Sequence, residues 1–423
     1  MIGLFAVSPL FVNFAQAVSY PVPHIVTTSG ITHANGNFLP IAQTVANAAN
    51  STEAYVQTYM TYSGTWSGFS LYFRTANASG DTTFTVRKNG VDTAMTITVP
   101  QSTTGFFQDL TNTVSVAVGD LVSIGVTTTA GTTTSVPSIT TLFTADSGDS
   151  VQYAMMYEPG AFSFTATNRY FRPAGDCTAA ITTEANAQNM IQHDATIEAI
   201  GVYVSANTRT QSTVFYNRIN GADGNVSVSV ASSATGLQFS DTSSDAVNAG
   251  DLINSRGAIA SGSGSIGIRN VQYTIVSDNP REITFMGGNT LSKSSATGSA
   301  WSFAAGYTMN SGAAEAVARS YPITPGVMSG EAYYVSANTA DQTLTYQLRK
   351  NASNVNNVVA IGAGVTGWVQ DVTNSDSFDL DDYSTMNGSR SVAGSGSTTM
   401  QNTSMKYTMD LIADSFIPQV DIF

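Results

Sequence analysis

The chain has 423 residues, which is long enough for two to four domains that each bury a core without metals or disulfides. Charged residues make up 11% of the sequence, and the formal net charge of −13 opposes binding to a phosphate backbone, which requires clustered Lys and Arg. The single cysteine, Cys177, excludes a disulfide framework within the chain, and we expect no nucleic-acid partner.

Residues 1–19 are an apolar N-terminal arm, and the first charged side chain of the sequence is Glu53. Ala15-Gln16-Ala17 resembles a signal-peptidase site, but a secretory signal normally carries a basic region that is missing here. The apolar run is too short to span a bilayer. We expect an uncleaved arm that hides its large side chains under the first domain or against a partner, and cleavage after Ala17 is the alternative. The apolar tail, residues 414–423, needs the same protection.

An internal repeat dominates the sequence. Several markers recur about 131 residues apart: Arg87, Arg218 and Arg349; Thr104-Gly105, Thr235-Gly236 and Thr366-Gly367; Asp120, Asp251 and Asp382; and Phe73 to Asn77, which recurs as Tyr203 to Asn207 and Tyr334 to Asn338. Agreement of separate markers at one spacing indicates tandem copies of one domain. The copies run over residues 20–147, 148–279 and 280–413.

Each copy has the periodicity of β-strands. Residues 84–86 lead through Asn89-Gly90 into the alternating run 95–99, which is a strong hairpin signal because both turn residues tolerate positive φ. Gly119-Asp120 predicts a further reversal. Sustained helical periodicity is missing, and the nearest candidate is the short stretch 44–50. About eight short strands per copy indicate an all-β fold of three tandem β-sandwich or jelly-roll domains.

A resemblance to a known family rests on the first copy. Its segments Thr83 to Gly90, Thr103 to Phe106 and Val114 to Val122 resemble the tandem repeat domains of bacteriophage virion surface and appendage proteins. Those domains are similar to the jelly rolls of tumour-necrosis-factor-like proteins. The third copy departs from the pattern, because Asp381-Asp382 stands where Gly-Asp is expected. The resemblance implies a jelly-roll fold and a virion role, and its families commonly work as trimers.

The inventory of catalytic groups is thin. The three histidines, His24, His33 and His193, have no second ligand at zinc spacing, and neither a nucleophile elbow nor a phosphate-binding loop occurs. His193-Asp194 is either an acid–base pair or part of a surface loop, and we favour the loop. We therefore predict no enzyme activity, no cofactor, and no catalytic, cofactor-binding or metal-binding residues.

Other candidate residues have a functional and a structural interpretation, and we favour the structural one. The Arg87, Arg218 and Arg349 series contacts a receptor or glycan, or pairs with neighbouring acids and carbonyls at strand ends. One acidic group either holds Ca²⁺ or caps turns; it consists of Asp371, Asp376, Asp379, Asp381 and Asp382. The series Asp109, Asp241 and Asp371 likewise provides either metal ligands or turn caps. The tryptophans either stack on sugar rings, as in a lectin, or belong to the core; they are Trp66, Trp301 and Trp368. Trp368 occupies the position that Phe106 and Leu237 have in the other copies, which predicts a core residue. The sequons at Asn77 and Asn351 are expected from composition alone.

These features favour a non-enzymatic virion structural protein: a capsid decoration protein, head fibre or tail appendage. We expect it to dock on other virion proteins through the apolar termini, with self-association and a host surface glycan as further partners. The alternatives are a secreted bacterial adhesin or lectin at the cell surface, and a self-assembling extracellular filament subunit. The equal spacing of the copies allows either a ring of three sandwiches around one axis or a linear rod.

Overall fold

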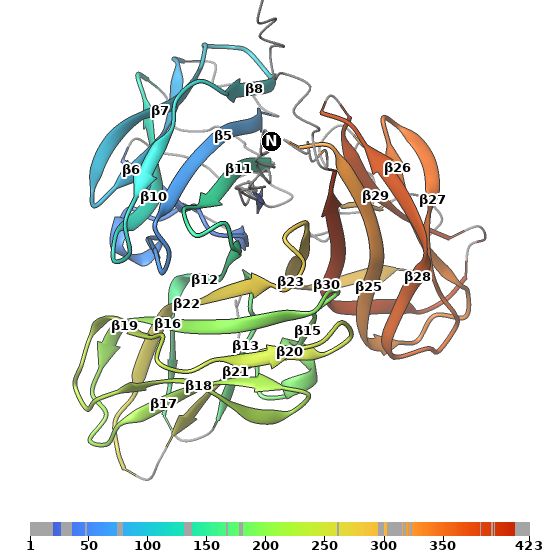
Figure 1. Ribbon diagram of the computed structural model, residues 1–423. Coiled ribbons are helices and arrows are strands. Elements are labelled where there is room, and N and C mark those ends of the chain that lie inside the picture. The colour runs from blue at the N-terminus through green and yellow to red at the C-terminus, as the bar shows by residue number, and fades with distance from the viewer. Residues whose placement is uncertain are drawn as a thin grey trace, which may run out of the picture.

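The computed structural model of the chain consists almost entirely of β-strands, which confirms the predicted all-β fold (Figure 1). The helical segments that it describes in full are two 3₁₀ turns, η1 (Glu53–Tyr55) and η2 (Glu184–Ala187). The structure describes residues 20–26, 36–46, 49–73, 79–130, 138–165, 168–176, 181–259, 262–294, 300–302, 315, 319, 321, 324–380, 382–390, 392 and 394–410. Within these ranges we find no helix of the length and apolarity needed to cross a membrane.

Sandwich 1 consists of two sheets. One sheet has the order β3-β1-β11-β5-β8, with β9 also paired to β5, and the other has the order β2-β10-β6-β7, with β4 also paired to β10. Its strands are β1 (Tyr20–Val26), β2 (Asn37–Pro40), β3 (Thr44–Ala46), β4 (Thr58–Tyr59), β5 (Gly64–Phe73), β6 (Thr82–Lys88), β7 (Val91–Val99), β8 (Gly105–Asp109), β9 (Val114–Val116), β10 (Leu121–Thr128) and β11 (Ser138–Ala145).

Sandwich 2 repeats this topology strand by strand. Its sheets have the orders β14-β12-β22-β16-β19, with β20 on β16, and β13-β21-β17-β18, with β15 on β21. The strands are β12 (Ser150–Phe164), β13 (Arg169–Phe171), β14 (Gly175–Asp176), β15 (Asn189–Met190), β16 (Ala195–Asn207), β17 (Thr213–Ile219), β18 (Ala222–Val230), β19 (Gly236–Ser240), β20 (Asp245–Val247), β21 (Leu252–Ile259) and β22 (Ile266–Ser277).

Sandwich 3 keeps the same order with fewer strands. Its sheets are β23-β30-β25-β28 and β24-β29-β26-β27, and β28 runs through the stretch that forms two strands, β8 and β9, in sandwich 1. The strands are β23 (Glu282–Ser294), β24 (Ala300–Ser302), β25 (Gly326–Asn338), β26 (Leu344–Lys350), β27 (Ser353–Ile361), β28 (Gly367–Phe378), β29 (Ser384–Ser389) and β30 (Ser397–Met409). One strand order therefore occurs three times.

The predicted hairpin is confirmed in all three sandwiches. Asn89 and Gly90 connect β6 to β7 with φ values of 52° and 78°. The equivalent turn of sandwich 3 is Asn351-Ala352, where even the alanine has a positive φ of 64°. The stretch 44–50, which was the nearest candidate for a helix, begins with β3 instead.

Strand pairing corrects one detail of the repeat. Tyr72 faces Phe106 across β5 and β8, Tyr203 faces Leu237, and Tyr334 faces Trp368, so these three tyrosines are equivalent. The sequence comparison that matched Phe73 with Tyr203 was wrong by one residue, because the first copy has one residue more between this tyrosine and Asn77.

Each sandwich has its own hydrophobic core, and two of the cores reach across a domain boundary. Val151, Tyr153, Met155 and Tyr157 of β12 pack into the core of sandwich 1, whereas Ala154 and Met156 of the same strand pack into the core of sandwich 2. Alternate residues of a strand point to opposite faces, so β12 is buried on both sides. A strand shared in this way holds the first two sandwiches together as one body.

The three sandwiches surround a common centre, as Figure 1 shows. There, two buried glutamine side chains link all three copies. Gln43 of sandwich 1 donates its Nε2 to the carbonyl of Met286 in sandwich 3 at 3.0 Å. Gln152 of sandwich 2 donates to Oε1 of Gln43, and to the carbonyl of Thr284 in sandwich 3 at 2.6 Å. These contacts distinguish the ring arrangement from the linear rod.

Candidate functional site between the sandwiches

The same interface occurs three times around the ring. Asn270 on β22 donates its Nδ2 to the carbonyl of Tyr55 at 2.8 Å, joining sandwich 2 to the η1 segment of sandwich 1. Asn402 on β30 donates equivalently to Asn186 of η2 at 3.0 Å. Ser138 on β11 donates its Oγ to the carbonyl of Arg319 at 3.1 Å, joining sandwich 1 to sandwich 3. The third contact closes the ring.

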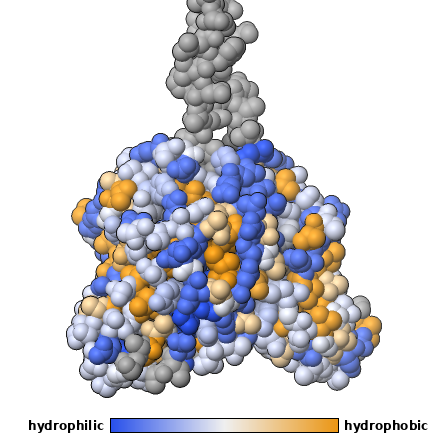
Figure 2. Space-filling model, turned by 60° about the horizontal axis from the view of Figure 1, so that its bottom comes forward, coloured by the Kyte–Doolittle hydropathy of each residue, from blue (hydrophilic) through white to orange (hydrophobic). Residues whose placement is uncertain are grey.

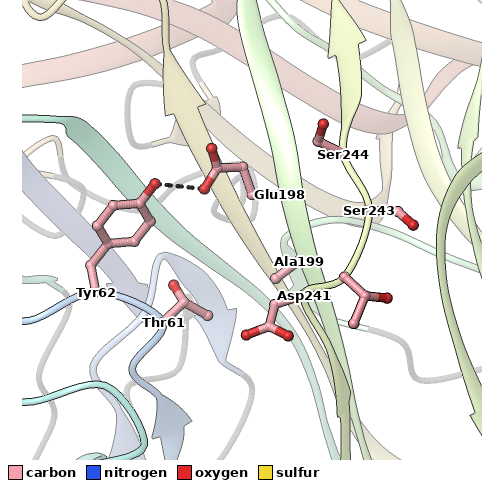
Figure 3. Close-up of a pocket in the computed structure, with 8 residues that line it drawn as sticks. Thr61, Tyr62, Glu198, Ala199, Asp241, Ser243 and Ser244 are labelled. Atoms are coloured by element: carbon pink, nitrogen blue, oxygen red, sulfur yellow. Dashed lines mark hydrogen bonds between the residues drawn. The ribbon is translucent and has the colours of Figure 1, made fainter.

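A cavity of about 410 Å³ lies at the first of these interfaces (Figure 3). Sandwich 1 contributes Thr61 and Tyr62 from the connection between β4 and β5. Sandwich 2 contributes Glu198 and Ala199 from β16 and the loop from Asp241 to Ser244, which connects β19 to β20. We call it the first interface cavity, and its lining consists mainly of hydroxyl and carboxylate groups.

Glu198 is placed in this cavity by an irregularity of its strand. The pairing of β16 with β22 shifts register between Ile197 and Ala199, so Glu198 is the extra residue of a β-bulge. Bulges change the direction of a side chain and occur often beside functional sites. Tyr62 donates its hydroxyl to Oε2 of Glu198 at 2.6 Å. Burial, and then the hydrogen bond to Glu198, raise the pKa of Tyr62, so the tyrosine remains a donor at neutral pH.

A second cavity of about 270 Å³ lies at the equivalent place between sandwiches 2 and 3. Four of its lining residues stand 131 after residues that line the first cavity: Gln192 corresponds to Thr61, Gly330 to Ala199, Ser329 to Glu198 and Val372 to Asp241. Lys406 also lines it. The fold thus provides the same hollow twice, and only the first hollow carries two acids.

The repeated arginines form ion pairs within their own sandwiches. Arg87 Nε lies 2.9 Å from Oε1 of Glu53, and Arg349 has the same contact with Glu315 at 2.9 Å. Arg218 lies 2.5 Å from Glu184, and its side chain is only 9% exposed. These contacts agree with the structural interpretation of the arginines as strand-end partners of nearby acids.

The aspartate series divides into turn caps and one exposed residue. Asp109 accepts from the backbone amides of Thr96, Thr111 and Asn112 at 3.0–3.1 Å. Partial burial raises the pKa of Asp109, but these hydrogen bonds outweigh it and lower the pKa overall. Asp371 caps the equivalent turn of sandwich 3, and similar hydrogen bonds lower its pKa to about 2 despite partial burial.

Asp241 does not belong to this series, contrary to our grouping. Ser240, not Asp241, is the residue that pairs with Ile200 as Asp109 pairs with Phe69. The side chain of Asp241 is exposed in the first interface cavity.

The acidic group of the third copy is divided between β28, which carries Asp371 and Asp376, and the turn after it, and its members have separate partners. Asp376 accepts from the backbone amides of Asn356 and Asn357 at 2.9 and 2.8 Å, and Asp382 pairs with Lys350 at 2.6 Å. Asp381 lies outside the described residues. Within the described part of the chain, no three His, Cys, Asp or Glu side chains are grouped closely enough to hold a metal ion.

His193 is buried, so our preference for a surface loop was wrong for this residue. Its side chain is 2% exposed, and Nδ1 lies 2.8 Å from the hydroxyl of Thr284 in sandwich 3. Burial, with a smaller contribution from Lys406, lowers the pKa of His193 to about 4. Asp194 is exposed and accepts instead from the amide of Ala249 at 2.9 Å. Each of the two side chains therefore has a hydrogen-bond partner of its own.

The tryptophans divide between the core and an interface. Trp66 is fully buried against Phe143 and Tyr153. Trp368 is only half-buried beside Tyr334, and Phe106 at the equivalent position is exposed, so the prediction that this position belongs to the core was wrong. Phe106 stacks on Tyr321 of sandwich 3 at 4.5 Å, which shows that the position lies at the ring interface. Trp301 is part of β24.

Glu331 is a residue whose importance the sequence analysis missed. It is 1% exposed on β25, at the position that Phe69 and Ile200 occupy in the cores of the other sandwiches. Burial, with the nearby charges of Asp371 and Asp376, raises its pKa to about 8. Neither carboxylate oxygen has a hydrogen bond of normal geometry, although the Tyr333 hydroxyl is close enough to oppose the rise in pKa. The 131-residue spacing, applied position by position, would have revealed an acid at a core site.

Several predicted features lie outside the described residues. These are the apolar arm 1–19, the tail 414–423, His33, Asn77 and Cys177. His24 lies on β1, where its backbone pairs with Ile139 of β11 and with Thr44 of β3.

Comparison with known proteins gives little further information. No family model matches the chain, and no curated protein matches it. Among solved structures, the crystal structure of the infectious bursal disease virus VP2 subviral particle has 7% identity and a TM-score of 0.17, covering 93% of this chain and 81% of its own. The structure of the infectious bursal disease virus Gx strain has 10% identity and a TM-score of 0.12 with the same coverage. Overlaps this slight carry no functional argument.

Proposed function

We propose that the chain is a non-enzymatic structural protein of a virus particle, in which one polypeptide provides a rigid ring of three sandwiches. The observation that carries the proposal is the closed ring. The contacts Asn270 to Tyr55 and Asn402 to Asn186 are equivalent, and Ser138 makes the corresponding contact to Arg319, two residues beyond the equivalent position, so each sandwich uses the same two surfaces to contact its neighbours. A jelly-roll trimer is formed by the same cyclic use of surfaces. Three covalently joined copies replace three chains.

The surface of the ring suits display rather than chemistry. Figure 2 shows hydrophobic patches scattered among hydrophilic residues on one face. Of the described residues, those that are large, hydrophobic and exposed lie in sandwiches 1 and 3: Val91, Phe106, Leu110, Val118, Val365, Val372, Leu380 and Val392. With charged residues at 11% of the sequence, hydroxyl and amide groups provide most of the solubility.

Within the virus particle, the proposed role is that of a capsid decoration protein, head fibre or tail appendage. The chain docks on other virion proteins through residues 1–19 and 414–423. The arm contains the leucines and phenylalanines Leu4, Phe5, Leu10, Phe11 and Phe14 among its apolar residues, and burying each of these side chains stabilises the docked state by about 1.5–3 kcal/mol. Ordering the arm costs about 1–2 kcal/mol for each residue, and these contributions offset part of that cost. The localisation proposed is the virion.

The test is mass spectrometry of gradient-purified virus particles from the source of the protein. We expect the chain in the particles, in stoichiometric amount and with its N-terminal peptide beginning at or near Met1. A chain found only in the secreted fraction, beginning at Val18, refutes the proposal and supports an adhesin. Deletion of residues 2–17 should then abolish attachment to particles while thermal unfolding of the sandwiches stays unchanged.

A further inference from the structure

We propose that the first interface cavity binds a neutral saccharide, and that Glu198 and Asp241 accept hydrogen bonds from its hydroxyl groups. This inference goes beyond the structural role and does not depend on it. The cavity of about 410 Å³ falls within the usual range for small-ligand sites. Every lining residue except Ala199 presents a hydroxyl or a carboxylate.

The two carboxylates have acceptor capacity left over. Tyr62 donates to Oε2 of Glu198, and Figure 3 shows no hydrogen bond to the other oxygen of Glu198 from the residues drawn. Asp241 is exposed, and no hydrogen bond or ion pair to its side chain occurs in the part of the chain that the structure describes. Figure 3 shows its carboxylate on the side of the cavity that faces Thr61. A carboxylate accepts only, so it requires a donor from a ligand or from water.

The repeat itself shows that these acids are not needed to close the ring. At the second interface Ser329 and Val372 stand in their places, and at the third the equivalent residues are Ser67 and Leu110. All three interfaces have a hydrogen bond from a polar side chain to a main-chain carbonyl that involves neither acid. Glu198 has one explanation in the hydrogen bond that it accepts from Tyr62 across the interface. Asp241 has no such partner in the described part of the chain and is absent from both related interfaces, and ligand recognition explains it.

The lining chemistry selects the ligand class. Vicinal sugar hydroxyls donate to carboxylates in charge-assisted hydrogen bonds, while hydroxyls such as those of Thr61 and Ser243 can donate or accept in return. None of the eight lining residues carries a positive charge, so an anionic sugar would be repelled. Tyr62 adds an aromatic ring at the rim, held by the hydrogen bond from its amide to the hydroxyl of Tyr153 at 3.1 Å.

Saturation-transfer difference NMR on the full chain tests the proposal. The probes are the methyl glycosides of galactose, glucose and mannose at millimolar concentration, with N-acetylneuraminate as the anionic comparison and spermidine as the cationic one. We expect transfer to at least one neutral glycoside and none to N-acetylneuraminate. Asp241→Asn and Glu198→Gln should each weaken binding about tenfold, which corresponds to the loss of one charge-assisted hydrogen bond.

The matched control is Asp278→Asn, which removes the same charge from an exposed position of sandwich 2 outside the cavity. It should leave binding unchanged. Asp241 is exposed, so Asp241→Asn should fold normally even if Glu198→Gln disturbs the contact with Tyr62. The proposal is overturned if no neutral glycoside binds, if only spermidine binds, or if both cavity variants bind as tightly as the native chain.

Discussion

Replacing Glu331 by isoleucine should stabilise sandwich 3 and remove a dependence of its stability on pH. The native structure holds a proton on this buried carboxyl up to about pH 8, whereas in the unfolded chain the carboxyl loses its proton near pH 4.5. Between these values the unfolded state binds fewer protons than the native state, so the free energy of unfolding falls as pH rises. The free energy of unfolding is therefore highest below pH 4.5, where Glu331 is protonated in both states, and reaches its lower value above about pH 8.

The size of the effect follows from the two pKa values. The rise from 4.5 to about 8 corresponds to a loss of about 5 kcal/mol across this window, at about 1.4 kcal/mol for each pH unit. This is a large part of the 5–15 kcal/mol that stabilises a typical domain. Sandwich 3 should therefore be the first of the three to open in mildly alkaline solution.

The assay is urea unfolding at a series of pH values across this window, read by tryptophan fluorescence. Trp301 and Trp368 belong to sandwich 3, so the signal reports mainly on this part of the chain. Glu331→Gln keeps the shape of the neutral carboxyl and should unfold without this pH dependence. Glu331→Ile copies the residue that sandwich 2 has at the equivalent position, Ile200, and should do the same at higher stability. Equal slopes for the native chain and both variants would refute the reasoning.

Three further changes test the ring and its supports. Arg218→Met removes a 9% exposed side chain and leaves Glu184 without its ion pair, while Asp223 keeps Arg256. It should lower the free energy of unfolding by about 2 kcal/mol in urea titrations; no loss would mean that the ion pair is dispensable. Gly175→Ala places a Cβ 2.5 Å from the carbonyl oxygen of Gly288 and should separate sandwiches 2 and 3, at a cost of about 1–3 kcal/mol. The control is Gly236→Ala, which also has a positive φ but has free space around it. In hydrogen-exchange measurements the control should leave the interface intact. Tyr321→Ala removes the stacking that closes the ring and should cost about 2 kcal/mol and increase the radius of gyration in small-angle X-ray scattering; an unchanged radius would contradict closure through this contact.

The sequence by itself determined the local structure and its repetition. The hairpin at Asn89-Gly90 was predictable because a two-residue turn with positive φ at both positions depends on its own residues and on the strands beside it. The partner of Arg87 was predictable in kind, since Asp92 lies five residues away across the same hairpin. Equal spacing then extended both features to the other copies.

Tertiary structure alone decided what lies between the sandwiches. The first interface cavity joins Tyr62, Glu198 and Asp241, which are far apart in the chain and meet only because sandwich 2 is held against sandwich 1. His193 is buried for the same reason, since the residue that covers it, Thr284, belongs to the next sandwich. Strand periodicity specifies which face of a strand a side chain occupies, but not whether a neighbouring domain covers that face. Burial at a domain interface depends on the relative orientation of whole sandwiches, which no local pattern encodes.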